Sequence, residues 1–445
     1  MDTKKLIANY QDELIHLVQN VIHYDTVQRE AEPGAPFGQN TADCLDYVLK
    51  VCQEFGFRTK NCDGYVGYAD YGTEGDLFGV LGHLDVVPVN PEEWKVPPFS
   101  GEIVDGKIYG RGTSDDKGPM MAALIALKAI KDQNLQLSKR IRLIFGCNEE
   151  SGMACMRYYV KNEELPAMAI SPDGEFPVIN GEKGIYSMIA MCGKPNENVL
   201  SIKAGTRLNI VPDKCVAEIR KGADVAMLRS YGIEVEEKED RLVLTTRGVA
   251  AHGSTPELGQ NATWPIFHAL AKAYPEDEVL QFVANKVCVD TNAVAWGFPM
   301  EDAQSGKLTV NLGTVELKDG VLMLGLDNRF PVTVTGKQLA EAYREHSPAF
   351  FRIMGGHASE PLWVDPSSTL VKTLVEVYEE HTGDKTGPIA IGGGTYSRML
   401  PLCVAYGPNF PGGEKVEHMS NEYIAIDRLM QMTEIYYDAF VRLCK

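Results

Sequence analysis

Hydrophobic and polar residues alternate with two different periods along the first 185 residues. Apolar residues at helical spacing predict helices at 5–22, 41–55 and 118–132. Short apolar runs predict strands at 77–81, 141–145 and 167–170. Strands that alternate with helices form mainly parallel sheets covered by those helices, so we expect an α/β fold. In such sheets, ligands bind beyond the carboxyl ends of the strands.

The pattern changes between residues 187 and 387. Alternating stretches predict strands at 214–220, 242–246 and 322–327, and helical spacing predicts helices at 263–273 and 337–345. The first pattern then resumes with a strand at 388–391 and a closing helix at 422–442. We therefore expect one domain formed by 1–186 and 388–445, with an α+β domain inserted at 187–387.

Composition agrees with two domains and narrows the classes of partner. The chain has 445 residues, 44% of them hydrophobic, which is ample for two cores. Its formal charge is 43 − 61 = −18, which repels phosphate backbones and anionic lipids, so we expect neither nucleic-acid nor membrane partners. No apolar run approaches the roughly 20 residues of a membrane span, and no signal peptide is recognisable, which predicts a cytoplasmic protein.

A histidine and an aspartate follow the first predicted strand. His83 and Asp85 come directly after the apolar run 77–82, two residues apart, so both side chains can lie on the same face. A histidine that binds a metal needs its second ring nitrogen held by an acceptor, and Asp85 could supply one. Taken alone, such a pair is more often structural than metal-binding.

Carboxylates recur at the ends of the other predicted strands. Asp115 lies in a glycine-punctuated loop before the helix at 118–132, Glu149 and Glu150 follow the strand at 141–145, and Asp173 follows the strand at 167–170. The sheet should bring them to one edge, where carboxylates repel one another unless cations neutralise them. The sequence therefore predicts a metal site. By contrast, we interpret Asp105 and Asp116 as turn or helix-capping residues.

Four motifs carry a resemblance to a known family. They are Gly82-His83-Leu84-Asp85-Val86-Val87-Pro88, Gly110-Arg111-Gly112 through Asp115 and Lys117-Gly118, Asn148-Glu149-Glu150-Ser151-Gly152, and Ser171-Pro172-Asp173-Gly174. In order and spacing they resemble the dinuclear zinc peptidases and deacylases, which include acetylornithine deacetylase, succinyl-diaminopimelate desuccinylase, aminoacylase, carnosinase and peptidase V. The resemblance spans nearly the whole chain. It implies a zinc-exopeptidase-like catalytic domain with an inserted lid domain.

The resemblance implies two divalent metal ions that share Asp115. His83 and Asp173 would bind one metal, and Glu150 and His418 the other. These nitrogen and oxygen ligands suit zinc best, although manganese and cobalt also accept them. Two metals about 3.5 to 4 Å apart can together activate the attacking oxygen and polarise the scissile carbonyl.

The same resemblance assigns roles to the neighbours of these ligands. Glu149 would be the general base that takes a proton from the attacking water and returns it to the leaving amine. Asp85 would orient His83. The peptide bond between Asp115 and Asp116 is expected to be cis.

Two segments of the insert, Thr206–Pro212 and Gly248–Pro256, resemble the lid motifs of the family. His252 would reach over the metals and stabilise the tetrahedral oxyanion. Asn209 and Arg329 would grip the carboxylate of the substrate, since an arginine fork can bind both oxygens. An ion pair with Asp327 inside the domain is the alternative interpretation of Arg329.

Two further stretches, Thr113–Pro119 and Gly392–Tyr396, are similar to peptidase V, a dipeptidase that acts on α-dipeptides and on β-alanyl dipeptides such as carnosine. By this resemblance Gly393 and Gly394 also contact the substrate. The insert has the size of the doubled lid of that branch, so one chain could supply its own lid residues. We therefore expect a monomer, without excluding a dimer.

We thus predict a cytoplasmic, metal-dependent exopeptidase that hydrolyses α-dipeptides with a free amino end, with β-alanyl dipeptides such as carnosine as further candidate substrates. One alternative is a deacylase that removes an acetyl or succinyl group from an amino acid with the same metals and base. A second alternative is a catalytically silent binding protein of the same fold. The presence of Glu149 beside all five ligand residues argues against the silent protein.

Overall fold

The structure is a computed structural model in which residues 2–445 are described, and it divides into two compact units. Unit 1 comprises 2–180, Val364–Ile389 and Thr395–Lys445, and unit 2 comprises Gly181–Trp363 and Ala390–Gly394. These bounds differ from the predicted insert at 187–387. The segment 364–387 belongs to unit 1 because helix α10 (Thr369–Thr382) packs against the closing helix α11 (Ile426–Cys444).

Unit 1 is built on a sheet whose central strands are parallel. β6 (Arg140–Gly146), β3 (Leu77–His83), β7 (Met168–Ser171) and β22 (Cys403–Ala405) lie side by side in that order. All three neighbouring pairs among them are parallel. The antiparallel strands β2 (Val66–Tyr71) and β1 (Arg58–Cys62) extend the sheet beyond β6. Strand β9 (Ile179–Glu182, whose last two residues belong to unit 2) extends it beyond β22. The predicted α/β class with a mainly parallel sheet is confirmed.

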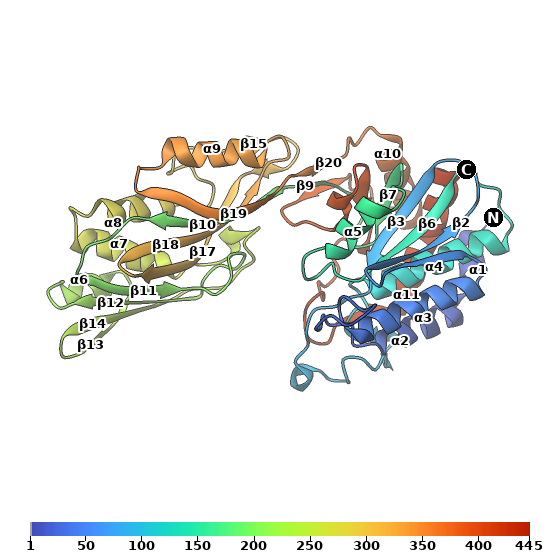
Figure 1. Cartoon of the computed structure of the whole chain (residues 1–445), viewed down its shortest axis with the longest axis horizontal. Helices are drawn as coiled ribbons and strands as arrows, with labels where there is room; N and C mark the ends of the chain where they lie inside the picture. The colour runs from blue at the N-terminus through green and yellow to red at the C-terminus, as the bar shows by residue number, and fades with distance from the viewer. Residues whose placement is uncertain (1) are drawn as a thin grey trace. The chain divides into compact units, whose positions relative to one another are not determined.

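The apolar runs of the sequence form the core of unit 1. Every residue of β3 is buried, as expected for a strand covered on both faces. Helix α4 (Lys117–Asp132) is buried along most of its length and packs against α11, beside β3 and β6 (Figure 1). The helix predicted at 5–22 is instead two helices, α1 (Thr3–Ala8) and α2 (Gln11–Ile22), separated at Asn9 and Tyr10.

The closing helix begins later than predicted. Residues Tyr423–Ala425 form strand β24, which pairs with β5 (Lys107–Tyr109), so α11 starts at Ile426 rather than at 422. This pairing places the segment before β24 beside the loop that precedes α4. The remaining helices and strands of unit 1 are α3 (Gln39–Glu54), α5 (Ala154–Asn162), β4 (Ile103–Val104), β8 (Gly174–Glu175), β21 (Ile389–Ile391, whose last two residues enter unit 2) and β23 (Pro408–Asn409).

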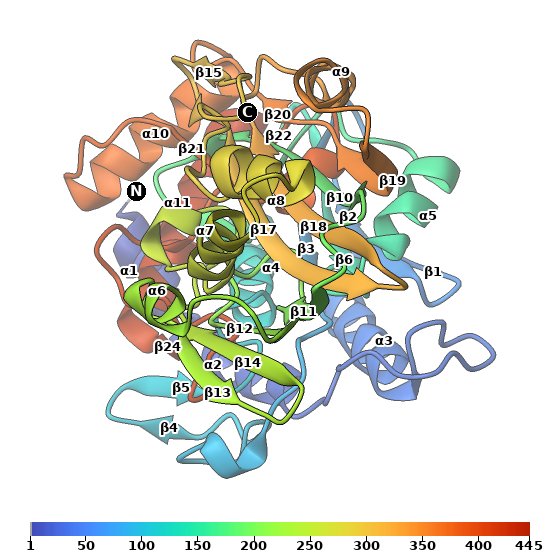
Figure 2. The same ribbon diagram turned by 90° about the vertical axis from the view of Figure 1, so that its left-hand side faces the viewer.

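Unit 2 contains an eight-stranded sheet in the order β13-β14-β12-β11-β17-β18-β10-β19, with antiparallel neighbours. In β12 (Lys214–Arg220), alternate residues are buried beneath α7 (Thr263–Ala273), which lies over the sheet beside α8 (Glu278–Phe282) (Figure 2). Unit 2 therefore has an α+β architecture, in which helices cover the apolar face of an antiparallel sheet.

The other elements of unit 2 are β10 (Gly184–Cys192), β11 (Val199–Ala204), α6 (Val225–Ser230), β13 (Glu234–Glu237), β14 (Arg241–Arg247), β15 (Glu301–Asp302), β16 (Gly306–Lys307), β17 (Thr309–Lys318), β18 (Val321–Phe330), α9 (Gly336–His346), β19 (Phe351–Ser359) and β20 (Leu362–Trp363).

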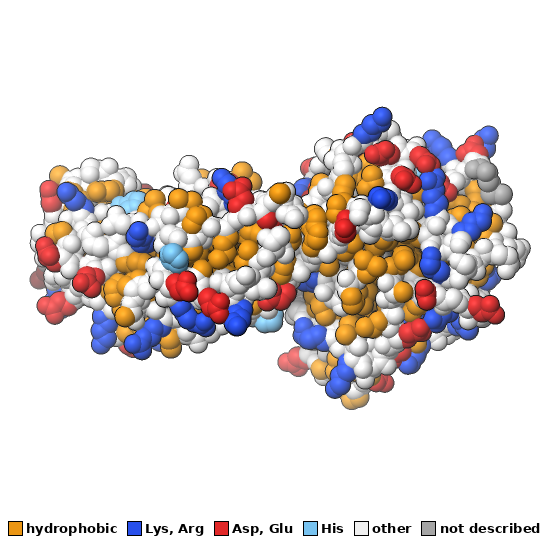
Figure 3. Space-filling model, turned by 90° about the horizontal axis from the view of Figure 1, so that it is seen from above, with side chains coloured by type: hydrophobic (Ala, Val, Ile, Leu, Met, Phe, Trp, Pro, Cys, Tyr) orange, Lys and Arg blue, Asp and Glu red, His pale blue; other side chains and the backbone are white. Residues whose placement is uncertain are grey.

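Basic and acidic side chains are intermixed on the face of the molecule drawn in Figure 3. Within residues 2–445, no helix combines the length and the apolar character needed to cross a membrane. All ten cysteines are buried as free thiols.

Candidate metal centre and substrate-binding cluster

The strand ends of unit 1 bring the predicted metal ligands together. His83 is the last residue of β3, Asp115 lies two residues before α4, Glu150 follows β6, and Asp173 follows β7. Because β6, β3 and β7 are adjacent and parallel, their carboxyl ends meet at one edge of the sheet. His418 joins them from the loop between β23 and β24.

Asp115 lies at the centre of this group. Its Oδ1 is 2.9 Å from Nε2 of His83, and its Oδ2 is 3.1 Å from Nε2 of His418. His418 Nε2 is also 2.9 Å from Glu150 Oε1. Two sets of potential ligand atoms, each within 4.8 Å of one another, therefore share Asp115: one with His83 and Asp173, the other with Glu150 and His418. These are the sets predicted above, and their assignment as metal ligands stays a prediction.

Glu149 lies beside both sets. A carboxylate oxygen of Glu149 falls within 4.8 Å of ligand atoms of His83 and Glu150. Burial, and next the negative charge of Asp173, raise the pKa of the Glu149 carboxyl well above its usual value. A carboxylate with a raised pKa is suited to accept a proton from water.

The charges and polar atoms of the cluster fit divalent cations. Burial opposes the charge of His83, yet Asp115 raises the pKa of this imidazole well above its usual value, and Asp115 and Glu150 raise the pKa of His418 to about 11. His83 Nε2 and Asp115 Oδ1 are buried and lie 2.9 Å apart, and within residues 2–445 neither atom is satisfied by a well-formed hydrogen bond. Nitrogen and oxygen atoms in this arrangement suit zinc, manganese or cobalt.

Asp85 acts differently from its predicted role. His83 Nδ1 hydrogen-bonds to the backbone carbonyl of Asp85 at 2.9 Å, whereas the nearest carboxylate oxygen is 3.6 Å away. The carboxylate instead accepts the backbone N–H groups of Glu149 at 2.9 Å and Glu150 at 3.1 Å. The Asp85 side chain therefore holds the two glutamates, and its backbone orients the histidine.

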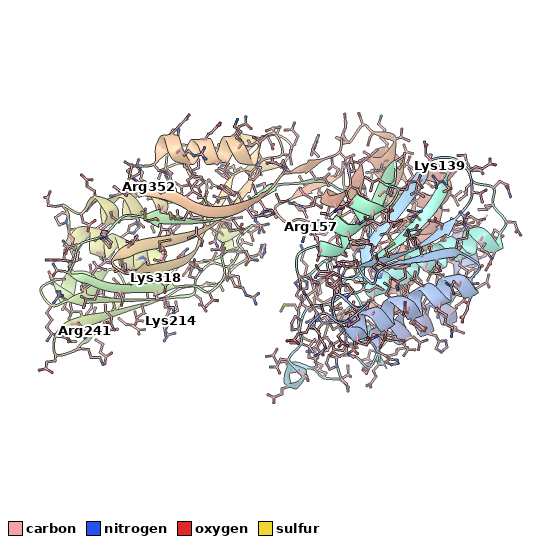
Figure 4. All side chains as sticks on the ribbon, viewed as in Figure 1. Lys139, Arg157, Lys214, Arg241, Lys318 and Arg352 are labelled. Carbon is pink, nitrogen blue, oxygen red and sulfur yellow. The ribbon has the colours of Figure 1, made fainter. Side chains whose placement is uncertain are left out.

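The loop that carries these glutamates has a second anchor. Arg157 of α5, labelled in Figure 4, donates from Nη1 to the backbone carbonyl of Gly152 at 2.6 Å. The loop between β6 and α5 is thus held at both ends of its turn.

The Asp116 side chain binds the backbone of His83, a role that the sequence pattern does not indicate. The peptide bond between Asp115 and Asp116 is cis, as expected. Asp116 occupies the N-cap position of α4 but makes no capping hydrogen bond with its side chain, and its Oδ2 accepts the backbone N–H of His83 at 3.1 Å. The capping interpretation of Asp116 is therefore wrong. Asp105, with a φ of 49°, does lie in the turn between β4 and β5, as predicted.

Three further residues adjoin the cluster and were not predicted from the sequence. The buried carboxylate of Glu422 binds Arg111 at 2.6 Å and the loop before α4. Burial raises the pKa of Glu422 to about 7, against the opposing charge of Arg111. The ring of Tyr396 meets that of His83 edge-on, with centroids 5.8 Å apart. Arg111 and Tyr396 lie inside motifs quoted above, and Glu422 lies four residues after His418, but the motifs gave these three residues no role.

The predicted substrate-binding residues gather in unit 2. The segment around Asn209 runs beside that of His252: Ile210 and His252 form a β-bridge, and Gly253 N–H donates to the Asn209 carbonyl at 2.7 Å. Arg329 donates from Nη1 to the Gly392 carbonyl at 2.9 Å, which brings the triple glycine to the same cluster.

The His252 ring is held by hydrogen bonds to Ser254, and its surroundings favour the neutral imidazole. Its Nδ1 accepts the backbone N–H of Ser254 at 3.2 Å and lies 2.7 Å from the Ser254 hydroxyl. Burial, and next the positive charge of Arg329, lower the pKa of this imidazole. Because Nδ1 is the acceptor, the proton of the neutral ring lies on Nε2, which can donate to a developing oxyanion.

Arg329 forms the ion pair that was considered as the alternative. Its Nη2 is 2.8 Å from Asp327 Oδ2, and its Nε is 3.2 Å from Oδ1, with both side chains buried. Asp327 therefore holds the guanidinium in a fixed orientation. The pair does not use all five N–H groups of arginine, so a role in carboxylate binding stays a prediction.

Comparison with known proteins gives a consistent family assignment. A family model described as peptidase family M20/M25/M40 matches residues 79–442. The chain is 38% identical to the Bacillus subtilis protein named "Putative dipeptidase YtjP", over 99% of both chains. It is 32% identical to the Staphylococcus aureus protein named "Putative dipeptidase MW1694", again over 99% of both chains.

Solved structures share the fold at low sequence identity. Human carnosine dipeptidase 1 aligns with a TM-score of 0.59 and 16% identity, covering 99% of this chain and 98% of that one. The dipeptidase Dug1p of Saccharomyces cerevisiae aligns with a TM-score of 0.57 and 14% identity, covering 99% and 98%.

Proposed function

The chain belongs to peptidase family M20/M25/M40 and is a metallopeptidase, and we propose that it is a dipeptidase with two divalent metal ions. The observation that carries the proposal is the position of Asp115, whose two oxygens face His83 and His418. One carboxylate placed between two such sets is the arrangement that a pair of metals needs. The names of the two bacterial relatives add support for a dipeptidase.

We propose separate roles in hydrolysis for the residues of unit 1. Bound divalent metals would supply the Lewis acidity that activates water and polarises the scissile carbonyl, with zinc as the expected metal and manganese or cobalt as alternatives. His83, Asp173, Asp115, Glu150 and His418 would hold them. Glu149 would accept the proton of the attacking water and return it to the leaving amine. Asp85 would keep Glu149 in place through its hydrogen bond to the backbone.

The residues of unit 2 would recognise the substrate. We propose that His252 donates from Nε2 to the oxyanion, a role supported by its neutral state and fixed tautomer. Arg329 and Asn209 would bind the terminal carboxylate, and Gly393 and Gly394 would also contact the substrate. The free amine of the dipeptide would be attracted to the carboxylates of unit 1, and Asp173 is our candidate for this contact.

The similarity to peptidase V in the segments Thr113–Pro119 and Gly392–Tyr396 supports substrates that include β-alanyl dipeptides such as carnosine. We also propose that the chain acts as a monomer in the cytoplasm.

One assay tests the proposal against its main rival. Metal-free protein is supplied with zinc, manganese or cobalt and assayed on Ala-Gly, β-Ala-His and N-acetyl amino acids. A dipeptidase cleaves the free dipeptides and leaves the acetylated compounds, because acetylation removes the charge of the amine and adds bulk. Faster cleavage of the N-acetyl amino acids would favour a deacylase. Binding of the metals without turnover of any substrate would favour a silent binding protein.

A further inference from the structure

We propose that Glu422 is a positioning residue that holds the Asp115 loop and the His418 loop at the separation required for two metals. This inference rests on the proposed function, because it concerns the same metal centre. It assigns a role to a side chain that is neither a predicted ligand nor a predicted base.

Glu422 binds the backbone of the loop before α4. Its Oε1 accepts the N–H groups of Ser114 at 2.8 Å, Gly112 at 3.1 Å and Asp115 at 3.2 Å. The Glu422 side chain is fully buried. One carboxylate therefore satisfies three amides of the segment that ends at Asp115, and one of these amides belongs to Asp115 itself.

Arg111 extends this contact toward His418. Its Nη1 donates to Glu422 Oε2 at 2.6 Å and to the backbone carbonyl of Met419 at 3.2 Å. Met419 directly follows His418 in the chain. The same guanidinium group thus contacts both the Glu422 carboxylate and the loop that carries His418.

The position of His418 depends on contacts that anchor its loop, because its own side chain is largely exposed to solvent. The His418 side chain is 53% exposed, whereas that of Asp115 is 12% exposed. Asn421 provides a second hold on the loop, since its Oδ1 accepts the N–H of Lys95 at 2.6 Å and its Nδ2 donates to the Glu93 carbonyl at 3.1 Å. Glu422 differs from Asn421 because its side chain accepts the backbone N–H of Asp115, whereas the Asn421 side chain contacts Glu93 and Lys95.

A carboxylate is required at position 422 because both of its oxygens face donors. Oε1 faces three amides, and Oε2 faces Arg111 and the amide of Gly112 at 3.1 Å. In Glu422→Gln, an NH₂ group replaces one of the two carboxylate oxygens. Either orientation of the amide places this hydrogen-bond donor against N–H groups that are themselves donors. Buried N–H groups would lose their acceptor, and the loop would shift to recover one.

The ion pair between Arg142 and Asp70 provides a matched control. It is also in unit 1 and largely buried, with Nε to Oδ1 at 2.7 Å and Nη2 to Oδ2 at 2.9 Å. It joins β6 to β2 and includes none of the predicted ligands. Asp70→Asn therefore reports the loss of stability alone.

The experiment compares metal binding by the wild type, Glu422→Gln and Asp70→Asn. Metal-free full-length protein is titrated calorimetrically with Zn²⁺, and the Co²⁺ forms are compared by visible absorption. We expect Glu422→Gln to bind at least one metal roughly 10- to 100-fold more weakly, with an altered Co²⁺ spectrum, as is typical when the partner of a ligand is lost. Asp70→Asn should lower Tm and leave the affinity and the spectrum unchanged.

Wild-type affinity and spectrum in Glu422→Gln would overturn the inference, even if its Tm were lower. If Glu422→Gln does not fold, Glu422→Asp is titrated instead: it keeps the charge but is one methylene shorter, so it cannot reach the amides and Arg111 together. Wild-type metal affinity in that variant would also overturn the inference. Failure of the wild-type protein to bind two metals would overturn the proposed function itself, a result distinct from a failure confined to position 422.

Discussion

The two clusters of candidate functional residues differ in how completely they satisfy their own charges. In unit 1, the carboxylates of Asp115, Asp173, Glu149 and Glu150 surround two imidazoles, and buried atoms of His83 and Asp115 lack hydrogen-bond partners among the described residues. In unit 2, Arg329 is paired with Asp327, and Nδ1 of His252 accepts a backbone N–H.

This difference separates a cluster that is suited to cations from one whose charged and polar groups are paired with one another. The cluster in unit 1 carries negative charge that its own residues do not neutralise, so metal binding should change its stability and its chemistry together. The cluster in unit 2 should keep its geometry whether or not metal is present. Five substitutions distinguish these two behaviours.

The largest effect is expected from Asp115→Ala. Both sets of potential ligands lose the residue they share, so the variant should lose at least one metal equivalent, and its dipeptidase activity should fall to background. Metal analysis after gel filtration and a dipeptide assay measure the two effects. Asp105→Asn, in an exposed turn, is the control and should retain both metals. Two retained metals in Asp115→Ala would contradict the shared role.

Glu149→Ala should separate chemistry from metal binding within unit 1. Loss of a general base lowers kcat by roughly 10²- to 10⁴-fold, and both metals should stay bound. Steady-state kinetics with metal analysis gives both values. Glu150→Ala is the comparison and should lose metal. If Glu149→Ala lost a metal equivalent, Glu149 would have to be counted among the ligands.

His252→Ala tests unit 2: this substitution should lower kcat and leave the metal content unchanged. Removing one donor to an oxyanion lowers kcat by roughly 10²- to 10³-fold. The metal content should not change, because His252 belongs to the cluster whose charged and polar groups are paired with one another. His268, whose Nε2 lies 3.0 Å from the Ala284 carbonyl, is the matched histidine of the same unit. A kcat for His252→Ala equal to that of His268→Ala would remove the oxyanion role.

Arg329→Lys keeps a positive charge beside Asp327 but removes the planar fork. We expect kcat/KM for a free dipeptide to fall by an amount equivalent to roughly 1.5 to 3 kcal/mol, the range for a hydrogen bond to a charged group. The fall should be much smaller for the C-terminal amide of the same dipeptide. Arg241→Lys, on β14, is the control. Equal losses on acid and amide would exclude carboxylate recognition by Arg329.

Ser254→Ala should have the smallest effect. The hydroxyl contact with His252 is lost, but the backbone N–H of residue 254 still holds Nδ1. A lost hydrogen bond of about 1 kcal/mol corresponds to roughly a fivefold lower kcat. A fall as large as that of His252→Ala would mean that the hydroxyl, and not the backbone, sets the tautomer.

Much of the fold could be read from periodicity alone. The strand β12 and the helix α7 have the predicted bounds, and β3, β6 and β7 lie within two residues of them at each end. The boundary of the insert was harder to place, because α10 returns to unit 1 through its packing on α11. That contact joins segments far apart in the chain, and no local pattern encodes it.

Local sequence is enough to identify the residues at the strand ends, because an apolar run followed by His83, Glu150 or Asp173 places a polar side chain at the edge of a parallel sheet. Tertiary structure alone decided the partners of these residues. The Asp85 carboxylate accepts the backbone N–H groups of Glu149 and Glu150, and the Glu422 carboxylate accepts the backbone N–H of Asp115. The physical reason is that hydrogen bonds between loops depend on angles and distances of a few tenths of an ångström, which the folded backbone sets and residue spacing does not.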